Sequence, residues 1–408
     1  MSPSQRQIYR RRRITVFGGL ILLLAMGFYL PLTLLAPLSP AVAEVQPWSA
    51  PATAPATLTF PGYGAVGIGA VGFPGVLASS GTANQLPIAS LTKVVTALTV
   101  LDAKPLALGA TGPDITFTDA DMGFYDDLVA QDGVVAPVVP GQVISERNIL
   151  DVMLMASAGN YADSVAVWAF GSEPAFLDAV KVWLAKAGLA NTTITDPTGI
   201  LASNTSSVAD LLQLGKLALS NPVVAQIVST VSLDVPGVGA VANRNELLGV
   251  DGVDGIKTGT LDESGACLLF SAKKNVGDHT IEIVGVALGG PDHPTVNADM
   301  HALLDQVTAG FHSVELVAKG DDFANYDTPW GDTASAVAAK TASVVVWSTT
   351  PMSVAVHADP LGTSRANSPA GSVVFTVGDK TITVPLEVAG RIADPGPWWR
   401  LTNPSKLF

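Results

Sequence analysis

The chain has 408 residues, of which 48% are hydrophobic, so it is long enough to bury a sizeable core and to form more than one domain. Its formal charge is −13, although the first thirteen residues carry five arginines and no acidic residue. The rest of the chain is therefore strongly acidic, which argues against nucleic acid as a partner.

The N-terminus pairs a basic tail, residues 1–13, with an almost uninterrupted apolar stretch, residues 14–36. The apolar stretch is long enough to cross a bilayer as a helix, and the arginines before it predict a cytoplasmic N-terminus. Everything after residue 36 is then expected outside the cytoplasm, held by a single-pass membrane helix. The Ala-Val-Ala sequence at 41–43 resembles a signal-peptidase site, so secretion after cleavage near Ala43 is the alternative to a retained anchor.

Three further regions follow the apolar stretch. Residues 37–58 are rich in Pro, Ala and Thr and are interpreted as an extended linker with no packed element. Residues 59–312 mix helical and strand patterns, which predicts an α/β or α+β domain with a mainly antiparallel sheet flanked by helices. We expect helices at 90–102, 146–170, 173–187 and 208–219, and strands at 65–73, 266–272 and 280–288, the last two joined as a hairpin at 275–278.

Residues 313–408 are interpreted as a linker and a small all-β module. An irregular stretch is followed by predicted strands at 343–347, 352–356, 372–377 and 381–388, with a turn at 378–380. The aromatic residues within 397–401 are predicted to close the edge of this module. Cys267 is the only cysteine, so no intramolecular disulfide forms, and its apolar neighbours predict a buried, inert thiol.

The first candidate for chemistry is the sequence Ser-Leu-Thr-Lys at 90–93, which opens an apolar helix. Residues three apart on a helix are neighbours, so the Lys93 amine can reach the Ser90 hydroxyl. Burial and a second cation would have to lower the pKa of Lys93 before it could accept the serine proton. Ser90 would also gain from the helix dipole at the N-terminus. Alone, this two-residue pattern arises easily by chance.

Two further segments complete the pattern. Lys257, Thr258, Gly259 and Thr260 lie on a predicted strand, where a lysine, hydroxyls and a glycine suit the binding of a peptide carboxylate. Between the two motifs, the sequence Ala-Ser-Ala-Gly-Asn-Tyr-Ala at 156–162 ends an apolar helix. Its Ser157 and Asn160 have the chemistry to relay a proton and to bind a substrate amide, although Gly and Asn at a helix end are equally typical of capping.

The order S-x-x-K, then a serine motif, then K-T-G is a known signature of penicillin-binding proteins and class A β-lactamases. Over residues 60–312 the chain resembles the low-molecular-mass penicillin-binding proteins, the serine D-alanyl-D-alanine carboxypeptidases of peptidase family S11. Segments that also resemble this family are 171–176, 191–199 and 243–248. The resemblance implies the penicillin-binding-protein or β-lactamase-like transpeptidase fold.

The resemblance also implies a role for each site residue. Ser90 would attack the penultimate D-Ala carbonyl, Lys93 would be its base, and Ser157 would pass a proton to the leaving D-Ala amine. Lys257 and Thr258 would hold the substrate carboxylate. The oxyanion hole would use the backbone N–H groups of Ser90 and Thr260. Peptidoglycan stem peptides are the implied substrates and β-lactams the implied covalent inhibitors, with no metal or organic cofactor.

One departure from the family concerns the middle motif, which is Ser-x-Asn in the family. Here the triplet at 157–159 is Ser-Ala-Gly, and Asn160 stands one place late. Either Asn160 supplies the substrate-binding amide through a shifted helix end, or the third position lacks an amide. Slower turnover or relaxed substrate preference would follow in the second case.

Two other functions compete with the carboxypeptidase. A class A-like β-lactamase would need a glutamate that positions water, and Glu173 in the sequence Glu-Pro-Ala-Phe-Leu-Asp is a candidate. The helical periodicity after it favours an N-terminal helix charge instead. A catalytically impaired wall-binding or scaffold protein is the second alternative. A Ser-His-Asp hydrolase is disfavoured, because the chain has no G-x-S-x-G sequence and no H-E-x-x-H metal motif.

Overall fold

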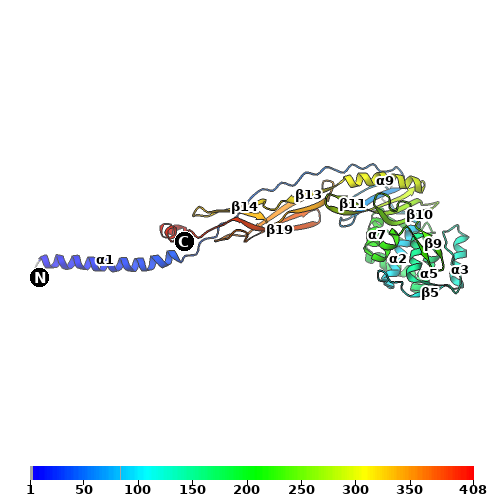
Figure 1. Ribbon diagram of the computed structural model, residues 1–408, viewed down its shortest axis with the longest axis horizontal. Helices are drawn as coiled ribbons and strands as arrows, with labels where there is room; N and C mark the ends of the chain where they lie inside the picture. Colours follow the sequence, from blue (N-terminus) through cyan, green and yellow to red (C-terminus); the bar gives the residue numbers. More distant parts are fainter. Residues whose placement is uncertain (1–2, 83) are drawn as a thin grey trace. The chain divides into compact units, whose positions relative to one another are not determined.

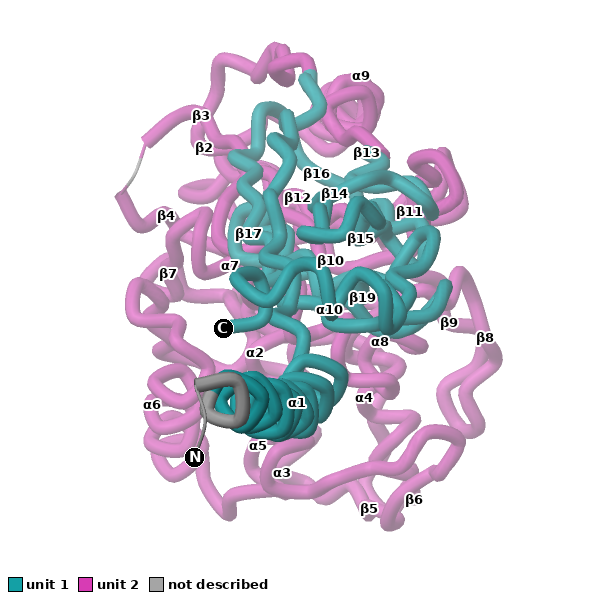
Figure 2. The backbone as a smooth tube through the Cα atoms, turned by 90° about the vertical axis from the view of Figure 1, so that its left-hand side faces the viewer, with its two compact units in different colours: residues 1–53, 314–408 teal, residues 54–313 magenta. Residues whose placement is uncertain are grey.

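The computed structural model describes residues 3–82 and 84–408. The chain forms two compact units, Ala54–Ser313 and a second unit that joins the described residues up to Thr53 with Val314–Phe408 (Figure 2). Each unit has its own cluster of buried hydrophobic side chains. The element labels used below are those of Figure 1.

The unit Ala54–Ser313 is built on a five-stranded antiparallel sheet. The strand order is β10 (Val253–Leu261), β11 (Gly265–Val276), β12 (His279–Gly290), β2 (Ala65–Ala70) and β3 (Ala78–Gly81). Residues 266–272 of β11 are all buried, which requires cover on both faces of the sheet. The predicted antiparallel sheet and the hairpin between β11 and β12 are confirmed.

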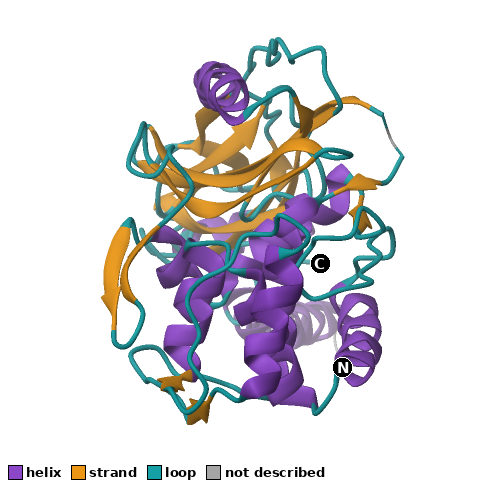
Figure 3. Ribbon diagram, turned by 90° about the vertical axis from the view of Figure 1, so that its right-hand side faces the viewer, coloured by secondary structure: helices purple, strands orange, loops and turns teal. Residues whose placement is uncertain are grey.

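Helices cover both faces of this sheet (Figure 3). One face is covered by α9 (His293–Ala309), and α7 (Val208–Ser220) packs on the other. Beyond α7 lie the helices α2 (Thr92–Ala103), α3 (Asp119–Val129), α4 (Glu146–Met155), α5 (Gly159–Phe170), α6 (Glu173–Ala187) and α8 (Pro222–Ser229). Residues 92–101 of α2 are buried on every side, so this helix lies at the centre of the core.

Short elements join these helices. One is the 3₁₀ turn η1 (Ala89–Leu91). The others are three two-stranded pairs: β4 (Leu86–Pro87) with β7 (Thr205–Ser206), β5 (Asp114–Thr116) with β6 (Val143–Ser145), and β8 (Ser232–Val235) with β9 (Gly239–Ala242). The single helical region predicted over 146–170 is wrong in one respect. It is two helices, α4 and α5, because Ser157 takes a left-handed φ of 64° that a continuing helix excludes.

The second unit contains the predicted β-rich module. Its six-stranded sheet has the order β1 (Glu44–Val45), β14 (Asp322–Asp327), β15 (Thr333–Ala338), β19 (Lys380–Gly390), β18 (Pro369–Val377) and β17 (Met352–Ala358), and β13 (Phe311–Val317) pairs with β16 (Ala342–Trp347). The four predicted strands are all present. Both β14 and β15 lie in or beside the stretch that was interpreted as irregular.

Part of the N-terminal segment, residues 41–48, packs on this module, which corrects the prediction that the linker over 37–58 holds no packed element. Ala41 exchanges two backbone hydrogen bonds with Leu361, at 2.7 and 3.0 Å, and β1 pairs with β14. The Trp48 indole packs edge-on against Phe375 and donates to the Leu316 carbonyl at 3.0 Å. These partners lie more than 260 residues away in the chain, so local composition gave no indication of them.

The N-terminal helix α1 (Pro3–Leu34) is long and apolar enough to cross a membrane. It contacts a short C-terminal helix, α10 (Gly396–Thr402), which η2 (Pro404–Lys406) follows. The Tyr29 hydroxyl donates to the Leu401 carbonyl at 2.7 Å. Trp399 packs on Trp330, as expected for an aromatic that closes the module, but Trp398 is 78% exposed and does not.

Candidate active site

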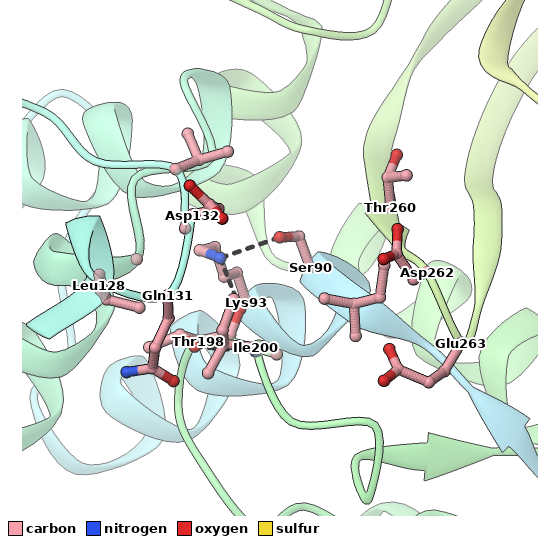
Figure 4. A pocket seen from close by; sticks show the side chains of 15 residues that line it. Ser90, Lys93, Leu128, Gln131, Asp132, Thr198, Ile200, Thr260, Asp262 and Glu263 are labelled. Carbon is pink, nitrogen blue, oxygen red and sulfur yellow. Dashed lines mark hydrogen bonds between the residues drawn. The ribbon is translucent and has the colours of Figure 1, made fainter.

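Ser90 lies in η1, immediately before α2, and Lys93 follows in the first turn of that helix. The Lys93 Nζ is 3.0 Å from the Ser90 Oγ and donates to the Thr198 carbonyl at 2.5 Å (Figure 4). The Lys93 side chain is buried, whereas Ser90 is only half-buried and lines a cavity. The structure therefore brings together the predicted nucleophile and base.

The pKa of Lys93 is lowered to about 8, mainly by burial and in smaller part by the Arg244 charge, against the opposing effects of Asp196 and Asp163. A lysine with this pKa carries a substantial neutral fraction near neutral pH. Its hydrogen bond to the Thr198 carbonyl uses one N–H, and the lone pair of the neutral amine is free to take the Ser90 proton. Burial and a second cation, Arg244, thus lower the pKa of Lys93 as a base at this position requires.

The carbonyl that orients Lys93 is held by a tight turn at 196–199. The Asp196 carboxylate accepts hydrogen bonds from the backbone N–H groups of Thr198 and Gly199, both at 2.7 Å. Gly199 has a φ of +79°, and a Cβ there would lie 2.0 Å from the Ala89 carbonyl oxygen. Sequence reasoning assigned this turn no role, although Asp-Pro-Thr-Gly is a typical turn sequence.

Ser157 lies in the break between α4 and α5, where it contacts the second lysine. The Lys257 Nζ donates to the Ser157 Oγ at 3.0 Å and to the Thr258 carbonyl at 2.9 Å. Burial lowers the pKa of Lys257 well below its ordinary value, and the charges of Lys93 and Arg244 add to this effect. Ser90 and Ser157, each in contact with a lysine, thus line the same cavity, while their roles in catalysis stay a prediction.

Asn160 is not placed to bind a substrate amide, which corrects that prediction. It is fully buried in the first turn of α5. Its Oδ1 accepts from the Ala136 N–H at 3.1 Å and its Nδ2 donates to the Ala136 carbonyl at 2.9 Å. Both ends of the amide therefore hold the loop at 134–136, whose Val134 lines the cavities beside Ser90.

The strand β10 forms one wall of the site. At Gly259 an added Cβ would lie 2.9 Å from the Ser90 backbone nitrogen, so glycine permits the close approach of β10 to η1. Thr258 and Thr260 point to the same side of the strand because they are two residues apart in regular pairing. This approach supports the predicted oxyanion hole of the Ser90 and Thr260 backbone N–H groups, which stays a prediction.

Two cavities meet at Ser90. The first, of about 420 Å³, contains Lys93, Thr198 and an acidic rim formed by Asp132, Asp262 and Glu263 (Figure 4). The second, of about 330 Å³, lies beside Ser157 and β10 and is also lined by Arg244, Glu246, His293 and Asn297. Sequence reasoning missed His293 and Asn297, since neither has a recognisable motif.

Glu173 occupies the first turn of α6, after the Ser172 N-cap, and does not line either cavity. This confirms its interpretation as an N-terminal helix charge. Burial raises the pKa of the Cys267 thiol, as expected of an inert cysteine. Among the described residues, no three His, Cys, Asp or Glu side chains are grouped to hold a metal ion.

The fold and the paired Ser–Lys contacts define a protein of the penicillin-binding-protein class. The sequence profile of peptidase family S11, described as D-alanyl-D-alanine carboxypeptidase, matches residues 74–290. The chain belongs to this family.

Similar proteins agree with that assignment. The chain is 30% identical to a D-alanyl-D-alanine endopeptidase of Pseudomonas aeruginosa over 201 residues, 47% of this chain and 60% of the relative. It is 25% identical to the D-alanyl-D-alanine carboxypeptidase DacF of Bacillus subtilis over 238 residues, 56% of this chain and 58% of the relative. The chain therefore spans less than two thirds of the length of these curated relatives.

The structural likeness confirms the predicted fold. The crystal structure of a peptidoglycan synthesis regulatory factor (PBP3) from Streptococcus pneumoniae matches with a TM-score of 0.60 and 18% identity. The match covers 82% of this chain and all of that one. Penicillin binding protein 5 from Haemophilus influenzae matches with a TM-score of 0.58 and 19% identity, over 85% of this chain and all of that one.

Proposed function

We propose that the protein is a serine D-Ala-D-Ala carboxypeptidase that removes the terminal D-alanine from peptidoglycan stem peptides and so regulates cross-linking. The observation that carries this proposal is the 3.0 Å contact between the Ser90 Oγ and a buried Lys93 whose pKa is about 8. A serine beside a lysine that can be neutral is an activated nucleophile.

The first half-reaction forms an acyl-enzyme. The Ser90 Oγ attacks the carbonyl carbon of the penultimate D-Ala while Lys93 takes the hydroxyl proton, and the backbone N–H groups of Ser90 and Thr260 stabilise the oxyanion. The C–N bond then breaks, and the proton that Lys93 took passes through the hydroxyl of Ser157, which Lys257 contacts, to the leaving D-Ala nitrogen. Lys93 is thereby neutral again for the second half-reaction. Lys257 and Thr258 hold the terminal carboxylate.

The second half-reaction releases the shortened peptide. Water attacks the ester carbonyl with Lys93 as the base, and the proton returns to the Ser90 oxygen as the ester bond breaks. A β-lactam would acylate Ser90 in the same way, because its strained amide takes the place of the D-Ala–D-Ala bond. No metal or organic cofactor is part of this scheme.

The test of this function is mass spectrometry of a stem pentapeptide incubated with the full-length protein in detergent. We expect the product to be shorter by one D-Ala, and we expect Ser90→Ala to give none. A wild-type protein that leaves the peptide intact would overturn the proposal. Rapid turnover of a chromogenic cephalosporin would favour the β-lactamase alternative instead.

We propose in addition that α1 is retained as a membrane anchor with the catalytic unit outside the cytoplasm. The Ala-Val-Ala sequence at 41–43 belongs to a segment that is hydrogen-bonded to the β module, because Ala41 pairs with Leu361. The Arg400 guanidinium donates to the Ala36 carbonyl at 2.5 Å, so the chain just after α1 also contacts α10. N-terminal sequencing of the protein isolated from membranes should detect the basic tail, residues 1–13, which shows that α1 has not been removed. A mature chain that begins at Glu44 would contradict retention.

A further inference from the structure

His293 is the first residue of α9 and faces Thr260 on β10. The His293 Nε2 is 2.8 Å from the Thr260 Oγ1, and both residues line the second cavity, beside Ser157 and β10. The mechanism above uses only the backbone N–H of Thr260. From the sequence, the Thr260 hydroxyl is already among the groups that suit a carboxylate, but His293 has been given no role.

The position of the His293 proton follows from what surrounds the ring. The Nδ1 atom is fully buried and has no hydrogen-bond partner within the part of the chain that the structure describes. A buried N–H without an acceptor is rarer in proteins than a buried acceptor without a donor. The neutral ring therefore carries its proton on Nε2 and donates it to the Thr260 Oγ1.

The surroundings keep the ring neutral. Burial lowers the pKa of His293, and the nearby Lys257 and Arg244 charges lower it against the opposing effects of Glu246 and Asp292. A neutral ring has one N–H, and the contact with Thr260 uses it.

This donation decides what the Thr260 hydroxyl can do. A hydroxyl that already accepts a hydrogen bond still has its own O–H to donate. That O–H has no acceptor among the hydrogen bonds of the described residues, and it lies on the same side of β10 as the Thr258 hydroxyl. A carboxylate bound beside Lys257 would therefore meet two hydroxyl donors on one strand.

We infer that His293 is a positioning residue that aims the Thr260 hydroxyl at the terminal carboxylate of the substrate, so that the site selects a free carboxylate over a blocked end. The inference rests on the proposed function and deepens it, because it assigns the preference for a free C-terminus to a residue outside the three motifs. His293 acts through Thr260 and touches no reacting atom.

The test compares two substrates that differ only in the C-terminal group. A D-Ala-D-Ala peptide with a free carboxylate and the same peptide as a carboxamide are given to the full-length wild type, His293→Ala, His293→Gln and Thr260→Val. Glutamine can place its amide N–H near the position of Nε2, and valine keeps the Thr260 backbone N–H. His301→Ala, on the same helix but outside both cavities, is the matched control.

We expect His293→Ala to raise the KM for the carboxylate peptide about tenfold, with a much smaller change in kcat and little change for the carboxamide. Thr260→Val should have the same effect, the double variant should add nothing further, and His293→Gln should restore most of the preference. His301→Ala should match the wild type.

Equal losses of His293→Ala on both substrates would overturn the inference, because a purely structural role gives that result. So would additive effects of His293→Ala and Thr260→Val. A wild type that cleaves neither peptide and takes no penicillin label would instead overturn the proposed function itself, so the two failures are distinguishable.

Discussion

The Ser90 and Lys93 pair depends on the protonation state of one amine. Burial is the main cause that lowers the pKa of Lys93 to about 8, so the protonated form predominates below this pH and cannot accept the serine proton. We expect the rate of acylation by benzylpenicillin to rise about tenfold per pH unit below about pH 8 and to level off above it. Stopped-flow measurements between pH 6 and 9 check this. A flat profile would contradict the assignment of Lys93 as the base.

Asn160 is expected to matter for stability instead of for substrate binding. In Asn160→Ala the N–H and carbonyl of Ala136 lose their partners in a buried place, which costs about 1–3 kcal/mol for each unsatisfied group. Urea unfolding should show this loss, whereas Asn275→Ala, which removes an exposed hydrogen bond, should change the free energy of unfolding by less than about 0.5 kcal/mol. A stable Asn160→Ala protein with a raised KM would restore the substrate-binding role.

The sequence was sufficient to predict the place of a site residue where a fixed spacing in a helix or strand determines it. Ser90 and Lys93 are neighbours because they are three apart at the start of a helix, and Lys257 is aligned on a strand whose pattern is clear. His293 was beyond this reasoning, and Arg244 was noticed only within a segment that resembles the family, since only the packing of α9 and of the loop before β10 brings the two side chains to the cavity. The prediction that Asn160 binds substrate was wrong. Ser157 has a left-handed backbone conformation, a new helix begins just after it, and Asn160, one residue past the family's position, has its side chain in the core.

At the level of elements, the approach of β10 to η1 builds the site, and Gly259 permits it. In Gly259→Ala the new Cβ would crowd the Ser90 nitrogen and the Ala89 side chain, at 2.9 and 3.0 Å, and push the strand away. We expect acylation by penicillin to slow about a hundredfold, because small displacements of reacting groups cost rates of this size.

The matched control for that change is Gly123→Ala in α3. An added Cβ meets nothing within 4 Å there, and alanine favours the helix by about 1 kcal/mol. Acylation should be unchanged in this variant. Wild-type acylation rates in Gly259→Ala would show that the distance between β10 and η1 is not critical.

Helices with strong caps were predictable from sequence, and elements that depend on distant partners were not. The predicted helix at 173–187 coincides with α6, which begins after the Ser172 cap and ends at Gly188 in a left-handed conformation. By contrast, β1 has only two residues, and it exists because β14, far along the chain, offers an edge to pair with.

At the scale of the whole molecule, the β module needs the N-terminal segment to complete its core. Trp48→Ala removes an indole that packs on Phe375 and bonds to the Leu316 carbonyl, and we expect a loss of about 3 kcal/mol in the stability of this module. Calorimetry of the full-length protein measures the loss, with Trp398→Ala as the exposed control. Equal melting temperatures for the two variants would show that residues 41–48 are only a linker.

The most direct test of the account is intact-protein mass spectrometry after exposure to benzylpenicillin, followed by mapping of the modified peptide. We predict one adduct per chain on the peptide that contains Ser90, and none on Ser90→Ala. Lys93→Arg should form the adduct far more slowly, because arginine cannot become neutral and act as the base. An unmodified wild-type protein, or an adduct that persists in Ser90→Ala, would contradict the assignment of Ser90 as the nucleophile.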